Sequence, residues 1–458
     1  MKKRIFSIIS ILLVAATAMS CATLSAFAKS DSSDDDANKF TAKFKDLDYG
    51  CNVKTESDTV LLVNLDTGVT VYSKAADKKR YPASLTKIMT YVVVAENVED
   101  FSKKVEVKQS VIDELVGTGS SLSGASEFVG KKITVEQLLQ CMMIESGNDA
   151  ALVLADYVGG KSGVKGFVKM MNAKAKELGC TNTHFVNPHG LHNKDHYTTA
   201  NDLYKITSYA LTLPEFSKIT NSTSYEIGDY YGSSTNHMLD STDTTYYYKY
   251  ARGIKTGTTD EAGRCLVTMA VADGYSYLAV LMHAPYVDDE TYGTMTDAAE
   301  LFRWAFRNIE LREIVSKETP ICEEKVNLSW DKSSIQLCPE NDYNALLTED
   351  VSDSDITITT NVPSSINAPV NQGDYVGTAD VYYKDEKVAT FRLLADEKVE
   401  RSTLLYVFDI LQSVFTSMYF IGAAIIVVVL FIIYLFVVVK HNKNAKKRKR
   451  QVKHYRDM

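Results

Sequence analysis

Cysteine, proline and tryptophan are scarce in this chain, whose 458 residues include 7 Cys, 8 Pro and 2 Trp. Beyond Cys21 the cysteines are scattered, which excludes the dense disulfide framework of small secreted domains. A disulfide between Cys322 and Cys338 remains an alternative. With few prolines, 45% hydrophobic residues and 24% charged residues, the composition indicates a globular protein of about two to three domains.

Positive charge is largely missing from the body of the chain. The formal net charge is −8, yet residues 440–458 hold nine Lys or Arg against one Asp, and residues 2–4 are all basic. Residues 5–439 therefore carry a net charge of −19. A body this acidic argues against nucleic acid as a partner.

The N-terminus, Met1 to Ala28, has the pattern of a secretory signal: three basic residues, an apolar core, and Ala26-Phe27-Ala28 as a cleavage site. A retained membrane helix is an alternative, but the apolar core is short for one. A lipoprotein site at Cys21 is another alternative, with a poor match around the cysteine. The acidic stretch that follows predicts a solvated linker.

The C-terminus predicts a membrane anchor. Met418 to Val439 is apolar and reaches about 33 Å as a helix, enough to cross a bilayer core. Before it, apolar residues recur at helical spacing and predict an amphipathic helix on the membrane surface. The basic tail predicts a cytoplasmic C-terminus, and the N-terminal signal predicts that the body lies outside.

The segment Pro82 to Lys87 places a serine, Ser84, three residues before a lysine and leads into an apolar run. On a helix such positions are neighbours, so Lys87 reaches the hydroxyl of Ser84. A serine nucleophile needs a base, and a lysine serves when burial or a nearby cation lowers its pKa. The pattern alone is weak, because Ser162/Lys165 and Ser329/Lys332 repeat it.

Ser146-Gly147-Asn148 forms a second polar segment at a predicted helix–helix junction. The preceding helix starts at Thr134, which is spaced from Gln137 as in a capping box. Ser-x-Asn recurs at residues 234–236 and 365–367, where a polar turn suffices as explanation. Around Ser146, apolar flanks predict that the polar groups are partly buried and need partners.

A third segment, Lys255-Thr256-Gly257, is predicted to lie on a strand beside a hairpin formed by residues 265–271 and 275–281. Another strand is expected just before it, at residues 245–248. The alternative for Lys255 is a charge that protects an edge strand against aggregation.

In this order the three segments resemble those of the penicillin-interacting serine acyltransferases. Residues 185–191, 196–203 and 255–263 are similar to the serine-type D-alanyl-D-alanine carboxypeptidases, the low-molecular-mass penicillin-binding proteins. The similarity runs from about Asp58 to Arg307 and resumes near residues 368–400. It implies an α+β fold: a β-lactamase/transpeptidase-like domain with an antiparallel sheet, flanking helices and a helical subdomain, then a small all-β domain and a C-terminal transmembrane helix.

The expected organisation follows from these patterns and from the resemblance. It comprises a signal peptide (1–28), a linker (29–50), the catalytic domain (51–315), a β-sandwich-like domain (316–400), an amphipathic juxtamembrane helix (401–417), the transmembrane helix (418–439) and a basic cytoplasmic tail (440–458).

The resemblance also implies catalytic roles. Ser84 would attack the carbonyl of the penultimate D-alanine, Lys87 would take its proton, and Ser146 would relay a proton to the leaving amine. The backbone N–H groups of Ser84 and Thr258 would form the oxyanion hole. For substrate binding it implies Asn148, Lys255 and Thr256, with Gly257 allowing close approach to the strand.

One position departs from the family. Many members carry a basic residue in an Asn-Arg-Leu-Leu-like segment that helps to hold the substrate carboxylate, and the nearest match here is Asn236-His237-Met238-Leu239. His237 would replace a permanent cation with a titratable one. Carboxylate binding is then expected to weaken as the pH rises past the pKa of the histidine.

Histidine clustering raises a metal alternative, since His184, His189, His192 and His196 fall within thirteen residues. Zinc D,D-peptidases exist, but the chain has no His-Glu-x-x-His pattern, and the segment reads as a loop. We expect no metal and no cofactor.

The sequence therefore predicts removal of the terminal D-alanine from peptidoglycan stem pentapeptides, with β-lactams as inhibitors and the membrane as a further partner. A D,D-endopeptidase or a weak β-lactamase would use the same chemistry. The latter needs a carboxylate for deacylation, and Glu145 is the adjacent candidate. A non-catalytic penicillin sensor or wall-binding protein would need a damaged Ser84/Lys87 pair or a signalling domain.

Overall fold

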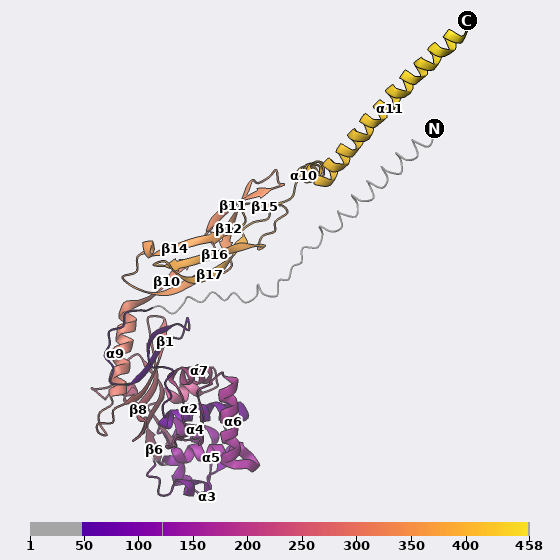
Figure 1. Ribbon diagram of the computed structural model, residues 1–458. Helices are drawn as coiled ribbons and strands as arrows, with labels where there is room; N and C mark the ends of the chain where they lie inside the picture. The colour runs from indigo at the N-terminus through magenta and orange to yellow at the C-terminus, as the bar shows by residue number, and fades with distance from the viewer. Residues whose placement is uncertain (1–47, 121, 457–458) are drawn as a thin grey trace. The chain divides into compact units, whose positions relative to one another are not determined.

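The computed structural model describes residues 48–120 and 122–456 (Figure 1). It divides into two compact units, one reaching to Ile314 and including Asn344–Asp355, the other made of Val315–Tyr343 and the chain from Ile356 onwards. The predicted signal peptide and most of the predicted linker lie outside the described residues.

The first unit is built on a five-stranded antiparallel sheet in the order β2-β1-β9-β8-β7. Alternating apolar residues predict a hairpin over residues 58–72, with its turn at Asp66-Thr67-Gly68, as well as the hairpin at 265–281. Both are confirmed, as is the strand that carries Lys255. Its strands are β1 (Thr59–Asn64), β2 (Thr70–Lys74), β7 (Ala251–Thr259), β8 (Gly263–Ala272) and β9 (Tyr275–Ala284).

The strand expected at residues 245–248 is wrong. This segment is a turn, because a carboxylate oxygen of Asp243 accepts hydrogen bonds from the backbone N–H groups of Thr245 and Tyr246, both at 2.9 Å. Aspartate commonly stabilises turns in this way and overrides the strand propensity of the tyrosines that follow.

Apolar layers cover both faces of the sheet. Alternate residues of β1 show this: Leu61 and Val63 enter one core, and Val60 and Leu62 enter the other. Helix α9 (Gly293–Asn308) packs on one face. The other face carries the helical layer, in which the longer helices are α2 (Thr86–Asn97), α4 (Val135–Met143), α5 (Asn148–Gly159), α6 (Gly163–Glu177) and α7 (Ala200–Ala210).

Shorter elements complete this unit. They are β3 (Lys104–Glu106) paired with β4 (Lys132–Thr134), β5 (Ser224–Ile227) paired with β6 (Tyr230–Ser233), and the helices α3 (Gln109–Ile112) and α8 (Phe216–Thr220). Strand β10 (Ile309–Val315) pairs with β13 (Tyr343–Thr348), and Leu346 of β13 is part of the core beneath α9.

Two helices position the polar segments. Residues Thr86 to Val94 of α2 are all buried, as expected for a helix in the middle of its layer. The capping box at the start of α4 is present as predicted, with Thr134 and Gln137 each bonding the other's backbone. Helix α4 ends at Met143 and α5 begins at Asn148, which confirms the predicted junction.

The second unit contains one six-stranded sheet in the order β14-β16-β17-β12-β11-β15. Alternating residues predict strands at 325–328, 356–359, 375–383 and 388–394, and each coincides with an observed strand. Cys322 and Cys338 are both free. Its strands are β11 (Cys322–Asn327), β12 (Ser334–Pro339), β14 (Ile356–Asn361), β15 (Ile366–Asn367), β16 (Tyr375–Tyr383) and β17 (Glu386–Ala395).

Two helices end the described chain. Helix α10 (Thr403–Thr416) is capped by the hydroxyl of Ser402 and exposes apolar side chains such as Leu404 and Phe408. Helix α11 (Met418–Arg456) includes Met418–Lys446, which among the described residues is the helix long and apolar enough to cross a membrane.

Candidate active site

The predicted nucleophile lies in a tight turn at the start of α2. A single 3₁₀ turn, Ala83–Leu85, carries Ser84, and Ala83 adopts a left-handed conformation with φ of 47°. Ser84 is partly buried and its neighbours Ala83 and Leu85 are buried. The turn therefore holds the hydroxyl at the surface of an otherwise packed region.

The loop that precedes α7 supports this turn. A methyl group at Gly190, whose φ is 92°, would lie 1.8 Å from the carbonyl oxygen of Ala83, so no side chain fits there. Thr86 donates its hydroxyl to the same carbonyl at 2.8 Å and lies 2.8 Å from Nε2 of His196. Nδ1 of His196 accepts from the backbone of Val186, which leaves Nε2–H to donate to Thr86.

Lys87 lies at the centre of the polar groups and is completely buried. Its Nζ is 2.8 Å from Oγ of Ser84, 2.6 Å from Oδ1 of Asn148 and 2.9 Å from the carbonyl oxygen of His189. Asn148 is the first residue of α5, so three separate segments meet at this one amine.

These partners determine what Lys87 can do. Oδ1 of Asn148 and the His189 carbonyl can only accept hydrogen bonds, and they take two N–H groups of the amine. A neutral amine then has its lone pair left for the hydroxyl proton of Ser84. The geometry suits a general base directed at a serine nucleophile.

The electrostatic surroundings favour that neutral form. Burial, and then the positive charge of Lys255, lower the pKa of Lys87 well below its usual value. The carboxylate of Asp149 acts in the opposite direction but more weakly. Burial also lowers the pKa of Lys255, to about 7.

The turn that carries Ser146 is held from several sides. Ser146 has a φ of 67°, and the residue before it, Glu145, accepts hydrogen bonds from the hydroxyl groups of Tyr225 and Tyr230 at 2.5 and 2.6 Å. After the turn, the carboxylate of Asp149 accepts from the backbone and the hydroxyl of Ser123. Glu145 is thus engaged by the β5–β6 hairpin.

Strand β7 lies against the turn that carries Ser84. A methyl group on Gly257 would lie 3.0 Å from the backbone nitrogen of Ser84, so this strand directly contacts the nucleophile turn. Lys255 is 1% exposed, and its Nζ donates to the carbonyl oxygen of Thr256 at 3.0 Å. The hydroxyl of Thr256 is 2.5 Å from that of Thr235, and Thr258 is exposed.

His237 lies beside these groups but is paired elsewhere. Its Nδ1 is 3.0 Å from a carboxylate oxygen of Asp243, and its ring packs on Tyr292 with 4.8 Å between the ring centroids. No hydrogen bond among the described residues joins His237 to Thr256 or Thr258.

The clustered histidines have structural partners. Burial lowers the pKa of His189 and of His196 to about 3, so both rings are neutral at physiological pH. Nδ1 of His189 accepts from the backbone of Leu191, and Nδ1 of His184 is 2.5 Å from the carbonyl oxygen of Asp195. Within the described part of the chain, no three His, Cys, Asp or Glu side chains are grouped as they would be around a metal ion.

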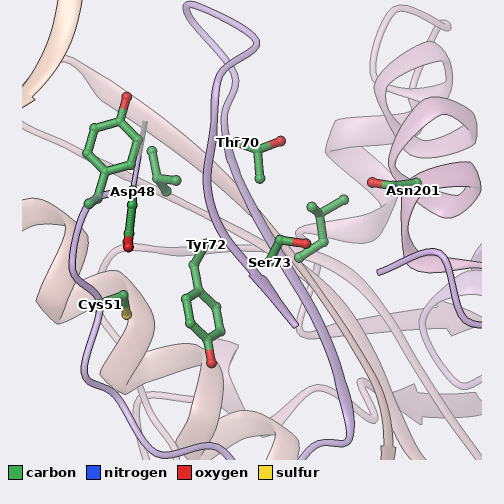
Figure 2. A pocket seen from close by; sticks show the side chains of 9 residues that line it. Asp48, Cys51, Thr70, Tyr72, Ser73 and Asn201 are labelled. Carbon is green, nitrogen blue, oxygen red and sulfur yellow. The ribbon is translucent and has the colours of Figure 1, made fainter. Parts of the chain in front are cut away.

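A separate cavity of about 420 Å³ lies at the edge strand β2. Figure 2 shows Thr70, Tyr72 and Ser73 of this strand, with Cys51 of the preceding segment on one side and Asn201 of α7 on the other. None of the predicted site residues lines it, so its size alone does not identify a functional site.

Sequence reasoning missed several groups that support the site. The contacts from Glu145 to Tyr225 and Tyr230 join residues 80 and 85 positions apart, which no local pattern reveals. Thr235 and His196 belong to loops, and only the folded chain brings them into contact with Thr256 and Thr86. Arg264, in contrast, could have been placed opposite Thr258 by pairing the strand predicted at Lys255 with the neighbouring strand predicted at residues 265–271.

A serine in a tight turn, a buried amine of lowered pKa beside it and a cationic strand opposite define the class, an acyl-transfer enzyme with a serine nucleophile. Comparison with known proteins agrees. Residues 48–286 match the family described as D-alanyl-D-alanine carboxypeptidase, and residues 310–401 match the C-terminal domain of penicillin-binding protein 5.

Individual relatives cover most of the same span. The D-alanyl-D-alanine carboxypeptidase DacF of Bacillus subtilis is 28% identical over 352 residues, covering 76% of this chain and 87% of the relative. A D-alanyl-D-alanine carboxypeptidase of Streptomyces sp. strain K15 is 34% identical, covering 53% and 85%. The chain belongs to the D-alanyl-D-alanine carboxypeptidase family of serine hydrolases.

Solved structures show the same fold. Penicillin-binding protein 5 from Haemophilus influenzae superposes with a TM-score of 0.60 at 25% identity, covering 77% of this chain and 99% of that protein. The Streptomyces K15 DD-transpeptidase gives a TM-score of 0.52 at 32% identity, covering 56% and 99%. The predicted α+β transpeptidase-like fold with an all-β second domain is therefore confirmed.

Proposed function

We propose that this serine D,D-carboxypeptidase removes the terminal D-alanine from peptidoglycan stem pentapeptides through an acyl-enzyme on Ser84. The observation that carries the proposal is the amine of Lys87, which is fully buried, lowered in pKa and 2.8 Å from the hydroxyl of Ser84. The family acts on peptides that end in D-Ala-D-Ala and binds β-lactams.

In the first half-reaction, Oγ of Ser84 bonds to the carbonyl carbon of the penultimate D-alanine while its proton moves to Lys87. The C–N bond to the terminal D-alanine then breaks, and the amine leaves with a proton relayed through Ser146. The short hydrogen bond that Lys87 donates to Oδ1 of Asn148 keeps the amine oriented through both transfers. Water completes the cycle by cleaving the Ser84 ester.

Charge that develops on the substrate oxygen is met by the backbone N–H groups of Ser84 and Thr258. Support comes from the contact of Gly257 with the backbone of Ser84, which brings the two segments together. One such donor contributes roughly 3–4 kcal/mol to lowering the barrier.

The substrate lies along β7 as an added strand. This placement is supported by the sheet order, in which β7 is an edge strand. Lys255 supplies positive potential near the peptide's end, and the hydroxyl of Thr256 bonds its terminal carboxylate. A β-lactam would acylate Ser84 in the same position and leave slowly.

Location and domain boundaries are proposals as well. The apolar helix Met418–Lys446 supports a single membrane span, with the basic tail on the cytoplasmic side and the catalytic domain (51–315) outside. In the chain, the domain 316–400 lies between the catalytic domain and the anchor, and residues 401–417 would lie on the membrane surface.

The test is D-alanine release from a pentapeptide ending in D-Ala-D-Ala. Wild type should release D-alanine, and Ser84→Ala should release none above background. Ser162→Ala is the matched control, because Ser162 is an exposed serine in another Ser-x-x-Lys pattern. Equal release by wild type and Ser84→Ala would overturn the proposal.

A further inference from the structure

Arg264, a cation beside the site, forms no salt bridge within the described part of the chain, although its charge helps to lower the pKa of Asp288. Arg264 of β8 is 8% exposed, and among the described residues no carboxylate oxygen lies within 4.0 Å of its guanidinium nitrogens. Its Nη2 donates to the carbonyl oxygen of Asp288 at 2.5 Å, and its Nε is buried without a hydrogen-bond partner. A buried guanidinium in this condition is costly unless a ligand supplies the missing acceptors.

The position of Arg264 is fixed next to the predicted substrate strand. It is the residue opposite Thr258 in the β7–β8 pairing, and its Nη1 is 3.5 Å from the hydroxyl of Thr258. Thr256 and Thr258 are two residues apart on β7, so their side chains share one face of the sheet. Arg264 therefore adds a positive charge on the face where Thr256 is expected to bind a carboxylate.

Two aromatic rings hold the guanidinium in place. Its central carbon is 4.8 Å from the ring centroid of Tyr286 and 4.3 Å from that of Tyr292. Stacking of this kind orients the planar group before any ligand arrives and reduces the entropy lost on binding.

His237 is less suited to the same task. It packs on Tyr292 as Arg264 does, but its Nδ1 is already paired with a carboxylate oxygen of Asp243 at 3.0 Å. The guanidinium of Arg264 stays charged at every physiological pH. The chain thus has a permanent cation close to the position where the family's Asn-Arg-Leu-Leu-like arginine is replaced by histidine.

We propose that Arg264 binds the terminal carboxylate of the substrate peptide and so selects peptides with a free C-terminal carboxylate over amide-terminated ones. This inference rests on the proposed function and deepens it, because it names the side chain that recognises the terminal carboxylate of the substrate. The vacant Nε and the face shared with Thr256 are the observations that carry it.

A purely structural role makes a different prediction. Through Asp288 and the two tyrosines, Arg264 also holds the segment that follows β9. If that were its whole contribution, removing it would weaken the site for every substrate alike. Carboxylate recognition instead affects only the substrates that carry the charge.

The experiment compares wild type, Arg264→Gln and Arg264→Lys on two acylated Lys-D-Ala-D-Ala peptides, one with a free carboxylate and one with a C-terminal amide. Arg252→Gln is the matched control, because Arg252 is exposed on β7. Reaction of Ser84 with p-nitrophenyl acetate, which has no carboxylate, reports whether each variant keeps a folded site.

Arg264→Gln should raise KM for the carboxylate peptide roughly 10- to 100-fold, the value of a lost charge-assisted hydrogen bond. Its kcat should change little, and the amide peptide should be unaffected, so the wild-type preference is lost. Arg264→Lys should recover part of the KM, and Arg252→Gln should match wild type.

The inference is overturned if Arg264→Gln keeps the wild-type preference, or if both peptides and the acetate ester are affected equally. Failure of the proposed function looks different, because wild type itself would then release no D-alanine, or Ser84→Ala would release as much as wild type.

Discussion

Replacing Gly257 by alanine is the sharpest test of how β7 and the nucleophile turn fit together. The added methyl group would lie 3.0 Å from the backbone nitrogen of Ser84, and 3.2 Å from both Cβ of Ala83 and the backbone nitrogen of Leu85. All three neighbours belong to the 3₁₀ turn Ala83–Leu85, and Gly190 packs closely against the same turn. The strand and the turn must therefore move apart by a few tenths of an ångström.

That small movement would displace a donor of the proposed oxyanion hole. The N–H of Ser84 is one of its two donors, and the substituted methyl group is aimed at that nitrogen. Loss of one donor costs roughly 3–4 kcal/mol in the barrier, so we expect kcat to fall about 100- to 1,000-fold. The free energy of unfolding should fall by only about 1–3 kcal/mol, the usual cost of overpacking.

The assay is D-alanine release, measured with the rate of Ser84 acylation by a fluorescent penicillin and with thermal unfolding. Arg252→Gln is again the control, since it changes an exposed position of the same strand. A Gly257→Ala enzyme that keeps acylation within about threefold of wild type would refute the oxyanion-hole geometry.

Three further outcomes are expected. The kcat/KM for peptide should first rise with pH, as Lys87 loses its proton, and then fall near pH 7, as Lys255 loses its charge in the free enzyme. Both steps come below the usual range for lysine because burial lowers both pKa values. A flat profile from pH 6 to 9 would contradict this. Tyr225→Phe removes a donor to Glu145 and should cost about 1–3 kcal/mol of stability in thermal unfolding. The exposed Tyr231→Phe should cost nothing measurable, and equal effects of the two variants would contradict the proposed support of the Ser146 turn. A chain ending at Arg401 should remain active and leave the membrane fraction, and its retention there would contradict the assigned anchor.

Much of the fold was predictable because its signals are local. The first hairpin follows from alternating residues around Asp66-Thr67-Gly68, and α4 begins where the Thr134 capping box places it. The wrong strand at residues 245–248 arose because the propensity of successive tyrosines was counted without the turn that Asp243 stabilises.

In the candidate site, too, local contacts could be predicted from the sequence and contacts between distant segments could not. The meeting of Ser84 with Lys87 is a matter of helical spacing, so the sequence was sufficient for that pair. The contact between Lys87 and Asn148 spans 61 residues and came only through family resemblance. The carbonyl of His189, which completes the partners of the amine, depends on the backbone of a loop and leaves no side-chain pattern to detect.

If Ser84 carries the acyl group, peptide mapping of the penicillin-labelled protein will locate the adduct on that residue. Trypsin cleaves after Arg80 and Lys87, so the modified residue is contained in the heptapeptide Tyr81-Pro82-Ala83-Ser84-Leu85-Thr86-Lys87. We expect one penicilloyl group, on this peptide and on Ser84. An adduct on any other peptide, or an unchanged level of labelling in Ser84→Ala, would contradict it.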